Sequence, residues 1–249
     1  MNLNDRIKKF WEGEAELYCG SIEDELKGFQ REAWKKVILE HAPRKDRLEI
    51  LDVGTGPGFF PILLGEEGHS VTGIDLSENM IRFARENAER EGIQAKFVTM
   101  DCQKLLFPEH TFDLVVCRNI TWTLDDPEAA YREWYRVLRP GGRVLIFDAC
   151  WYLHLFDEEI GKRYRENEKR IQEKYGRGAH GHNDPEEEQF LGRKLFLSDK
   201  YRPQWDLDIL IRIGFAQVFS TLDITGRVWD ELGKELNAVS PQFLVGGEK

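Results

Sequence analysis

The 249-residue sequence has few cysteines, and they do not cluster. Cys19, Cys102, Cys117 and Cys150 are widely separated, none forms a CxxC pair, and three lie in or beside apolar runs that are typical of core strands. Disulfide frameworks and structural zinc sites both need paired, regularly spaced cysteines. We therefore expect neither a disulfide framework nor a zinc site.

Long apolar runs and basic tracts are also lacking. No segment approaches the roughly 18–20 apolar residues that a membrane-spanning helix needs, and no apolar stretch typical of a secretory signal follows the N-terminus. The net charge of −10 argues against a nucleic-acid partner, which favours a basic face. These features predict a cytoplasmic protein, a monomer or homodimer, that acts on a small molecule.

The middle of the chain alternates between apolar strands and amphipathic helices. Strands are predicted at 48–53, 70–75, 96–100, 112–117 and 143–149, with helices at about 57–67, 78–91 and 127–138. Ser77 is suited to cap the second of these helices, and Gly92 to end it. Such alternation predicts an α/β fold with a parallel sheet and ligands at the carboxyl ends of its strands.

The two flanks differ from this pattern. Residues 1–42 place apolar side chains at helical spacing, from Asp5 to Tyr18 and again from Glu23 to His41. Residues 151–204 begin with aromatic side chains and continue into a charged helix at about 157–175, as expected of a cap over a site. The regular pattern returns with a helix at about 205–213 and strands at 216–223 and 242–245.

The strongest motif is the glycine-rich loop at residues 52–58, which reads DVGTGPG. Glycines allow a tight turn and close approach to a ligand, and the following helix directs free N–H groups at it. A dinucleotide site would need G-x-G-x-x-G, whereas here Phe59 occupies the position of the third glycine. Asp52 would repel a pyrophosphate but attract an ammonium or sulfonium group.

Two further acidic positions follow predicted strands. Asp75 ends the second strand, where a carboxylate can accept hydrogen bonds from both hydroxyls of a ribose. Asp101 and Cys102 follow the third strand, where a carboxylate and a backbone N–H can hold an adenine edge, or where Asp101 can simply cap a turn.

Four segments in this order resemble the class I S-adenosylmethionine-dependent methyltransferases, and among them the ubiquinone/menaquinone biosynthesis C-methyltransferase group. The matching segments are ILDVGTGPG at 50–58, GIDLSENM at 73–80, FDLVV at 112–116 and EWYRVLRPGG at 133–142. The resemblance implies a Rossmann-like seven-stranded, mostly parallel sheet with one antiparallel strand and helices on both faces. It implies one methyltransferase domain over 1–249, with a helical lid (1–42), a cofactor-binding core (43–150), a cap insertion (151–204) and C-terminal core strands (205–249).

The resemblance also assigns the parts of S-adenosyl-L-methionine, whose product is S-adenosyl-L-homocysteine. The glycine loop would hold the methionine part and Asp75 the ribose, with Leu76 or Met80 beside the adenine. The full set of predicted cofactor-binding residues is Asp52, Gly54, Thr55, Gly56, Asp75, Leu76, Met80, Asp101, Cys102, Asn119 and Tyr18.

Three members of the predicted site depend mostly on the resemblance. Asn119, after the fourth strand, would contact the amino group of the cofactor, and Trp122 would form a wall of the acceptor pocket. Tyr18 would lie over the cofactor from the N-terminal helix, where an aromatic face near a sulfonium contributes roughly 0.5–2 kcal/mol. Plain core packing is the alternative for both Trp122 and Tyr18.

Methyl transfer from a sulfonium is an in-line displacement in which positioning can supply roughly 7–11 kcal/mol, and some acceptors also need a general base. His154 follows the fifth strand at the functional edge, so His154 and Trp122 are the predicted catalytic residues. The other candidate bases are Asp148, Glu158, His180 and His182. The last two could bind a metal with Asp184, but such loops are usually solvated, and no metal is predicted.

Two other functions stay open at this point. The first is a nucleotide-dependent oxidoreductase, disfavoured by Asp52 and by the missing third glycine. The second is a cofactor-binding protein without catalysis, disfavoured because no cofactor motif is degraded. RNA and protein acceptors lack a supporting basic tract, and no motif specifies which acceptor atom is methylated.

Overall fold

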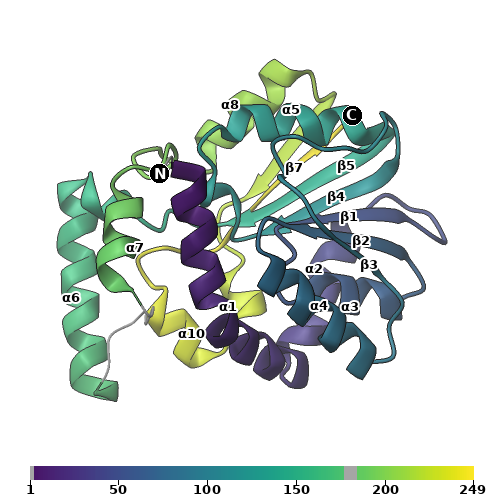
Figure 1. Cartoon of the computed structure of the whole chain (residues 1–249). Coiled ribbons are helices and arrows are strands. Elements are labelled where there is room, and N and C mark those ends of the chain that lie inside the picture. The colour runs from purple at the N-terminus through teal and green to yellow at the C-terminus, as the bar shows by residue number, and fades with distance from the viewer. Residues whose placement is uncertain (1–2, 177–183) are drawn as a thin grey trace.

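The computed structural model describes residues 3–176 and 184–249 and contains a seven-stranded sheet (Figure 1). The order of strands across the sheet is β3-β2-β1-β4-β5-β7-β6. The strands are β1 Glu49–Val53, β2 Ser70–Asp75, β3 Lys96–Thr99, β4 Phe112–Arg118, β5 Leu138–Asp148, β6 Gln217–Thr221 and β7 Phe243–Glu248. β7 runs antiparallel to both neighbours, and the other pairs are parallel. The predicted mostly parallel sheet with one reversed strand is confirmed.

Helices cover both faces of this sheet. The helices are α1 Leu3–Lys27, α2 Gln30–His41, α3 Phe59–Glu66, α4 Glu78–Arg90, α5 Pro127–Val137, α6 Glu158–Tyr175, α7 Pro185–Gly192, α8 Gln204–Ile213, α9 Thr225–Val228 and α10 Glu231–Leu236, with short 3₁₀ turns η1 Thr121–Thr123 and η2 Leu153–Leu155. α5 and α8 lie on one face and α2, α3 and α4 on the other (Figure 1). None of the helices in the described ranges is long and apolar enough to cross a membrane.

The pleat of the strands explains the two layers. Successive side chains point to opposite faces, so in the fully buried strand β4 Leu114 and Val116 pack on one face and Val115 and Cys117 on the other. A strand covered on both sides reads as an unbroken apolar run, which is the pattern that predicted it. The core is therefore two apolar layers that share one sheet.

The predicted cap on α4 is confirmed, because the Ser77 hydroxyl accepts a hydrogen bond from the Met80 N–H at 3.1 Å. The start of β5 differs from the prediction. Leu138 already pairs with Phe112, five residues before the expected start, and the register then jumps to Leu114 opposite Arg143. The intervening glycine turn bulges out of the ladder while the buried Leu138 stays in the core.

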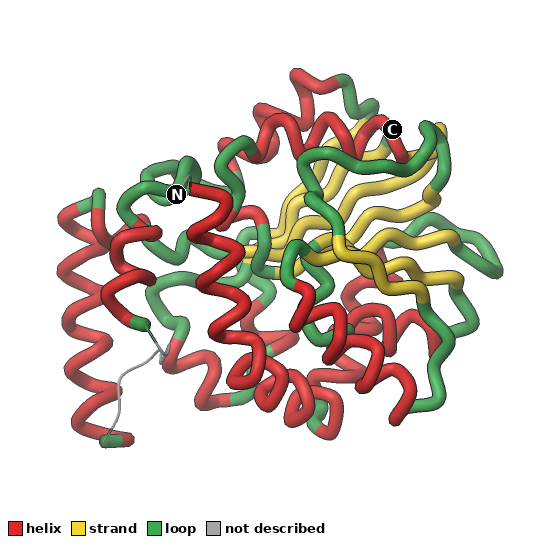
Figure 2. The backbone as a smooth tube through the Cα atoms, viewed as in Figure 1, coloured by secondary structure: helices red, strands yellow, loops and turns green. Residues whose placement is uncertain are grey.

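The N-terminal helices also divide later than predicted. α1 continues to Lys27 because buried Cys19, Ile22 and Leu26 extend its apolar stripe through the expected break. The helices α7, α9 and α10 were not predicted, since each is short and lacks a clear apolar period. Figure 2 shows α1 standing between one end of the sheet and the α6–α7 pair.

Candidate functional site

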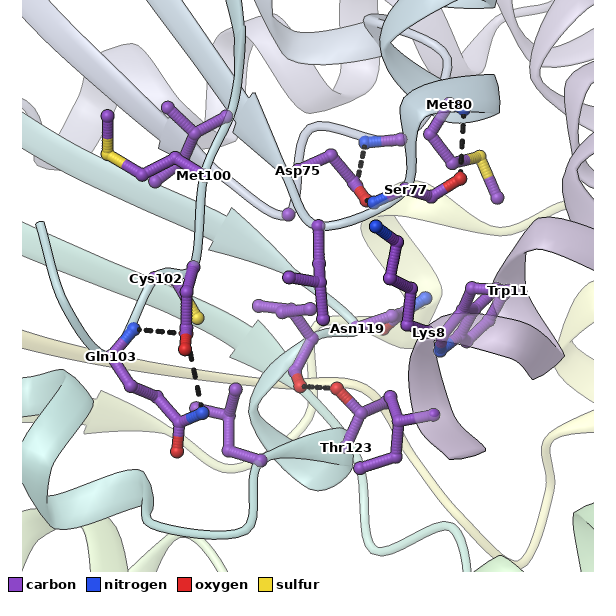
Figure 3. Close-up of a pocket in the computed structure, with 18 of the residues that line it drawn as sticks. Lys8, Trp11, Asp75, Ser77, Met80, Met100, Cys102, Gln103, Asn119 and Thr123 are labelled. Atoms are coloured by element: carbon purple, nitrogen blue, oxygen red, sulfur yellow. Dashed lines mark hydrogen bonds between the residues drawn. The ribbon is translucent and has the colours of Figure 1, made fainter. Parts of the chain in front are cut away.

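A cavity of about 770 Å³, counted with its solvent-open mouth, lies at the carboxyl ends of β1, β2, β3 and β4. Lys8 and Trp11 of α1 form one wall, and Met100 and Cys102 lie across from them, with Asp75 between (Figure 3). Nine predicted cofactor residues line this cavity, namely Tyr18, Gly54, Gly56, Asp75, Leu76, Met80, Asp101, Cys102 and Asn119. The strand ends thus bring together residues that are far apart in the sequence.

The glycine loop meets this cavity through backbone that only glycine adopts readily. Gly54 and Gly56 have φ values of 64° and 51°. A Cβ on Gly54 would lie 2.7 Å from Cγ1 of Ile120, and a Cβ on Gly56 would lie 3.3 Å from the Tyr18 ring. A side chain at Gly54 would therefore collide with Ile120, and one at Gly56 would crowd Tyr18 at the cavity wall.

Asp75 faces the cavity with both carboxylate oxygens held by backbone. Oδ2 accepts from the Gly56 N–H and Oδ1 from the Ser77 N–H, each at 2.9 Å. A carboxylate has about four acceptor positions, so each oxygen keeps a lone pair for a ligand hydroxyl. Burial outweighs these hydrogen bonds and raises the pKa of Asp75 to about 6. The carboxylate of Asp75 is thus fixed in orientation and shielded from water at the cavity wall, as expected of a group that binds a ligand.

Asp52 and Thr55 lie beside this cavity, in a smaller hollow that also reaches Gly54 and Arg118. The Thr55 hydroxyl donates to Oδ2 of Asp52 at 2.6 Å. Burial raises the pKa of Asp52 to about 7 despite that hydrogen bond and the charge of Arg118. A cationic ligand group near Asp52 would favour its ionised form.

The opposite wall combines apolar and polar groups. Met80 is buried and Leu76 half-buried at the start of α4. Oδ1 of Asp101 accepts from the Gln103 N–H at 2.9 Å, so Asp101 caps a turn and also lines the cavity. The carbonyl of Cys102 accepts from Nε1 of Trp134 at 3.2 Å, and burial raises the pKa of its thiol. This wall is suited to a flat, largely apolar group with polar edges.

Arg118, at the end of β4, is a site residue to which the sequence assigned no role. It is buried, forms an ion pair with Glu25 of α1 at 2.5 Å, and lies 4.6 Å from the centre of the Phe59 ring. It also interacts with Tyr18, whose pKa is raised by burial. The strand before it indicates that Arg118 lies at the edge of the sheet that binds ligands. Nothing in the sequence indicates that its ion-pair partner is Glu25, 93 residues earlier in the chain.

Other contacts of α1 hold this helix over the cavity. The carboxylate of Glu12 accepts from the backbone N–H groups of Glu78 and Asn79 at the start of α4, at 2.8 and 3.3 Å. At its other side, Arg6 forms an ion pair with Glu187 of α7. The helix therefore bridges the sheet and the cap.

A second cavity, also about 770 Å³ with its open mouth, lies under the cap. It shares Trp11, Tyr18 and Asn119 with the first cavity, so the two spaces adjoin. Trp122 and His154, the predicted catalytic residues, both line the second cavity. Asn119 at the junction has a φ of 55°, and its Oδ1 accepts from Nε2 of Gln242 at 2.9 Å.

The surroundings of His154 fix its orientation. Nδ1 lies 3.0 Å from the carbonyl oxygen of Trp151, and the ring stacks on Tyr164 with centres 3.8 Å apart. A carbonyl only accepts, so Nδ1 carries a proton in this contact. The ring is thus held between the Trp151 carbonyl and Tyr164 at the wall of the second cavity.

The other candidate bases have different surroundings. Asp148 is fully buried, and it accepts from the Trp122 N–H at 3.1 Å and from Nε1 of Trp151 at 2.8 Å. It also pairs with the buried Arg202 at 3.1 Å, so it positions two pocket walls and lies in neither cavity. Glu158 is exposed on α6.

The candidate metal histidines, His180 and His182, lie outside the described residues. Within residues 3–176 and 184–249, no group of three or more histidine, cysteine, aspartate or glutamate side chains is arranged to hold a metal.

Residues 51–146 match the family model described as a methyltransferase domain. Over 116 residues the chain is 41% identical to phosphoethanolamine N-methyltransferase 3 of Arabidopsis thaliana, covering 46% of this chain and 24% of that protein. Over 117 residues it is 35% identical to demethylmenaquinone methyltransferase of Thermus thermophilus, covering 46% and 53%. The chain thus spans between a quarter and about half the length of these relatives.

Solved structures share the fold over most of the chain. Phosphoethanolamine N-methyltransferase 2 of Haemonchus contortus, in complex with phosphomonomethylethanolamine and S-adenosylhomocysteine, has a TM-score of 0.65 at 18% identity, covering 98% of this chain and 60% of its own. The [4+2]-cyclase SpnF has a TM-score of 0.57 at 18% identity, covering 87% and 79%. Residues 51–146 thus carry a methyltransferase domain, and the motifs and strand order are similar to those of the class I S-adenosylmethionine-dependent methyltransferases, including the ubiquinone/menaquinone C-methyltransferase group.

Proposed function

We propose that the protein transfers a methyl group from S-adenosylmethionine to a small-molecule acceptor bound under the cap. The observation that carries this proposal is the junction of the two cavities at Trp11, Tyr18 and Asn119. One cavity has the residues expected for the cofactor, and the other is a separate space beside it. A methyl donor and an acceptor held in these two spaces would meet at the shared wall.

The residues fit the cofactor part by part. The glycine backbone at Gly54 and Gly56, which lines the cavity near the carboxylate of Asp52, suits the methionine part with its cationic amino group. Asp75 offers an acceptor lone pair to each ribose hydroxyl. Met80 and the wall formed by residues 100–103 suit the adenine. In this arrangement α1 acts as the lid and residues 151–204 as the cap.

The bound cofactor supplies a methyl group on a sulfonium that is already a good leaving group. A lone pair on the acceptor forms the new bond to carbon while the carbon–sulfur bond breaks and its electron pair stays on sulfur. The protein mainly has to hold the two groups in line, which can supply roughly 7–11 kcal/mol. Nε2 of His154 would take the acceptor proton where one must leave.

The names of the relatives support a small acceptor, because phosphoethanolamine and demethylmenaquinone methyltransferases are named for small molecules. The net charge of −10 disfavours nucleic acid. A cytoplasmic location and a monomeric or dimeric state remain proposals from the sequence. The [4+2]-cyclase of similar fold shows why turnover itself must be measured.

Calorimetry with S-adenosylhomocysteine and, separately, with NAD tests the cofactor. We expect binding of the former only, and binding of NAD alone would favour the oxidoreductase alternative. A pool of small amines, phenols, quinols and thiols is then screened with S-adenosylmethionine labelled in its methyl group. Cofactor binding without label transfer to any pool would contradict the proposed catalysis.

The base is tested with the full-length His154→Gln variant once an acceptor is found. Loss of general-base catalysis typically lowers kcat by roughly 10²–10⁴-fold, with S-adenosylhomocysteine affinity unchanged. His110→Gln serves as the matched control, because His110 precedes β4 at the end of the sheet opposite the cavities and contacts the Leu138 carbonyl. An unchanged kcat in the His154 variant would remove this residue from the mechanism.

A further inference from the structure

The side chain of Asn119 lies at the wall that the two cavities share, as Trp11 and Tyr18 also do. Its backbone has a φ of 55°, in the left-handed region that asparagine adopts more readily than most residues. Its N–H donates to the Phe147 carbonyl at 2.8 Å, which fixes this backbone at the carboxyl end of the sheet. The orientation of the Asn119 amide then decides which polar atoms meet a ligand at the shared wall.

Gln242 sets that orientation from the core of the molecule. It precedes β7 at the carboxyl end of β5, and only 1% of it is exposed. Its Nε2 donates to Oδ1 of Asn119 at 2.9 Å. The backbone of Gln242 is itself fixed, because its N–H donates to Oγ1 of Thr225 at 2.9 Å and its carbonyl accepts from the Ile224 N–H at 2.7 Å. Gln242 is thus a rigid support for Asn119.

Stability alone does not explain a glutamine at this position. Oε1 of Gln242 is buried and has no hydrogen-bond partner among the described residues, which costs free energy. A methionine has nearly the same length and shape and would avoid that cost. Gln242 does not occur among the described residues that line either cavity, so the cost is not offset by direct contact with a ligand. What the glutamine adds is the hydrogen bond to Asn119.

That hydrogen bond determines what Asn119 offers to a ligand. An amide carries its oxygen and its nitrogen on opposite sides, so Oδ1 turned toward Gln242 leaves Nδ2 directed away from it, toward the cavities. A hydrogen bond accepted by the amide oxygen also polarises the amide and strengthens its N–H groups as donors. Asn119 therefore presents donors to the shared wall. The resemblance, in contrast, implies an Asn119 that accepts from the amino group of the cofactor.

The carboxylate of the methionine part is the cofactor group that suits such a donor. Lys8 and Arg118 are the cations among the described residues that line the first cavity, and Arg118 directly precedes Asn119. Arg118 also lines the smaller hollow beside the glycine loop, where the methionine part is proposed to lie. A guanidinium has five N–H donors, so the ion pair with Glu25 leaves others for a second carboxylate.

We infer that Gln242 is a positioning residue, which orients the amide of Asn119 so that Nδ2 donates to the carboxylate of S-adenosylmethionine. The inference rests on the proposed function. Asn119 contacts the cofactor, and Gln242 acts only through Asn119. A methionine part anchored beside Arg118 and Asn119 has its carboxylate end fixed near the shared wall, which restricts where the sulfonium and its methyl group lie.

The test compares two ligands on the full chain by calorimetry. Decarboxylated S-adenosylmethionine retains the ammonium and the sulfonium of S-adenosylmethionine and lacks only the carboxylate. Its affinity is measured by displacement of S-adenosylhomocysteine, so that weak binding is also quantified. Asn119→Gly keeps the backbone freedom needed at a φ of 55° and removes the amide, and Gln242→Met removes the donor to that amide.

S-adenosylmethionine should bind roughly tenfold or more weakly to Asn119→Gly, and roughly 3- to 10-fold more weakly to Gln242→Met, as expected for loss of one hydrogen bond and of its support. The affinity for decarboxylated S-adenosylmethionine should not change in either variant. An equal loss for both ligands would overturn the inference, because a contact with the amino group or a general distortion of the site would weaken both.

The double variant separates positioning from a merely structural role. If Gln242 acts only through Asn119, the double variant should bind S-adenosylmethionine within about twofold of Asn119→Gly alone. Losses that add in the double variant would overturn the inference. Gln217→Met is the matched control, since it makes the same substitution at the exposed start of β6, opposite Glu248 at the other end of β7, and should change neither affinity.

Thermal unfolding completes the comparison. Tm of Gln242→Met should stay close to that of the wild type, because the substitution also removes a buried oxygen that has no partner among the described residues. A Gln242→Met variant that does not fold would show a structural role and overturn the inference. Failure of the wild type to bind S-adenosylmethionine or S-adenosylhomocysteine refutes the proposed function. Normal binding by both the wild type and Gln242→Met refutes only the positioning role.

Discussion

Replacement of Asp75 gives the most direct test of the cofactor site, because this carboxylate connects the glycine loop to the start of α4. Its oxygens each accept one backbone N–H at 2.9 Å, from Gly56 and from Ser77, and each keeps a lone pair for a ribose hydroxyl. Hydrogen bonds to a charged group contribute about 1.5–3 kcal/mol. Water restores part of the loss, so Asp75→Ala should weaken S-adenosylhomocysteine binding by roughly 1–3 kcal/mol, or about 5- to 150-fold.

Calorimetry with S-adenosylhomocysteine measures this change, and thermal unfolding of the free variants shows whether the loop is intact. Asp75→Asn retains one oxygen acceptor but not the charge, so it should fall between the alanine variant and the wild type. Glu78→Gln, exposed at the start of α4, is the control and should bind normally. A folded Asp75→Ala variant that binds within twofold of wild type would refute the ribose assignment.

The pH dependence provides a second readout of the same group. Burial raises the pKa of Asp75 to about 6 in the free protein, and only the ionised form accepts from both hydroxyls. Affinity for S-adenosylhomocysteine should therefore rise as pH increases through about 6. The rise should be shallower in Asp75→Ala, in which only the nearby Asp52, with a pKa of about 7, still titrates. Identical pH profiles would contradict the assignment.

Three further predictions concern stability. Gly54→Ala should lower Tm, because the residue has a φ of 64° and the new Cβ would meet Ile120, whereas Gly20→Ala in the exposed part of α1 should be neutral or stabilising by up to about 1 kcal/mol. The Tm of Asp52→Asn relative to that of the wild type should increase as pH rises from 4 to 8. Burial raises the pKa of Asp52 to about 7 in the folded protein, whereas the unfolded chain releases this proton near pH 4, so the wild type loses stability over this range and the asparagine variant does not. A Tm difference between the two proteins that does not change with pH would contradict a buried, protonated Asp52. Asp148→Ala should lower the free energy of unfolding in urea by about 3–5 kcal/mol, since it leaves a buried arginine with one carboxylate fewer. A loss below 1 kcal/mol would show that this ion pair is dispensable.

The sequence predicts the centre of the sheet well because strands such as β1 and β4 are buried on both faces. Such strands read as short apolar runs, and the glycine loop marks where the first one ends. The boundaries were less accurate where tertiary packing overrides the local signal, as at Leu138, which pairs with Phe112 ahead of a glycine turn. The reversed strand β7 followed from the resemblance, since no local pattern encodes the direction of a strand.

The two cavities of the site also differ in how far the sequence predicts them. The cofactor half is built from residues that follow successive strands, so the topology alone brings Gly54, Asp75 and Asn119 to one edge. No comparable rule relates sequence position to place in the fold for the residues of the cap. Arg202 reaches Asp148 from 54 residues away, and Glu188 belongs to a helix with no amphipathic signal. The signs of the cavity under the cap in the sequence were the aromatic residues after β5 and Trp122, which the resemblance placed beside the acceptor.

This division has a consequence for specificity. Loops and insertions can vary while a sheet covered on both faces is kept, so under the proposed function segments outside the core would choose the acceptor. Here those segments are α1, residues 151–204 and the 3₁₀ turn after β4, and each contributes rings to one cavity. The cofactor half would serve any acceptor equally well. Under the proposed function, the rings around the cavity below the cap would therefore select the acceptor.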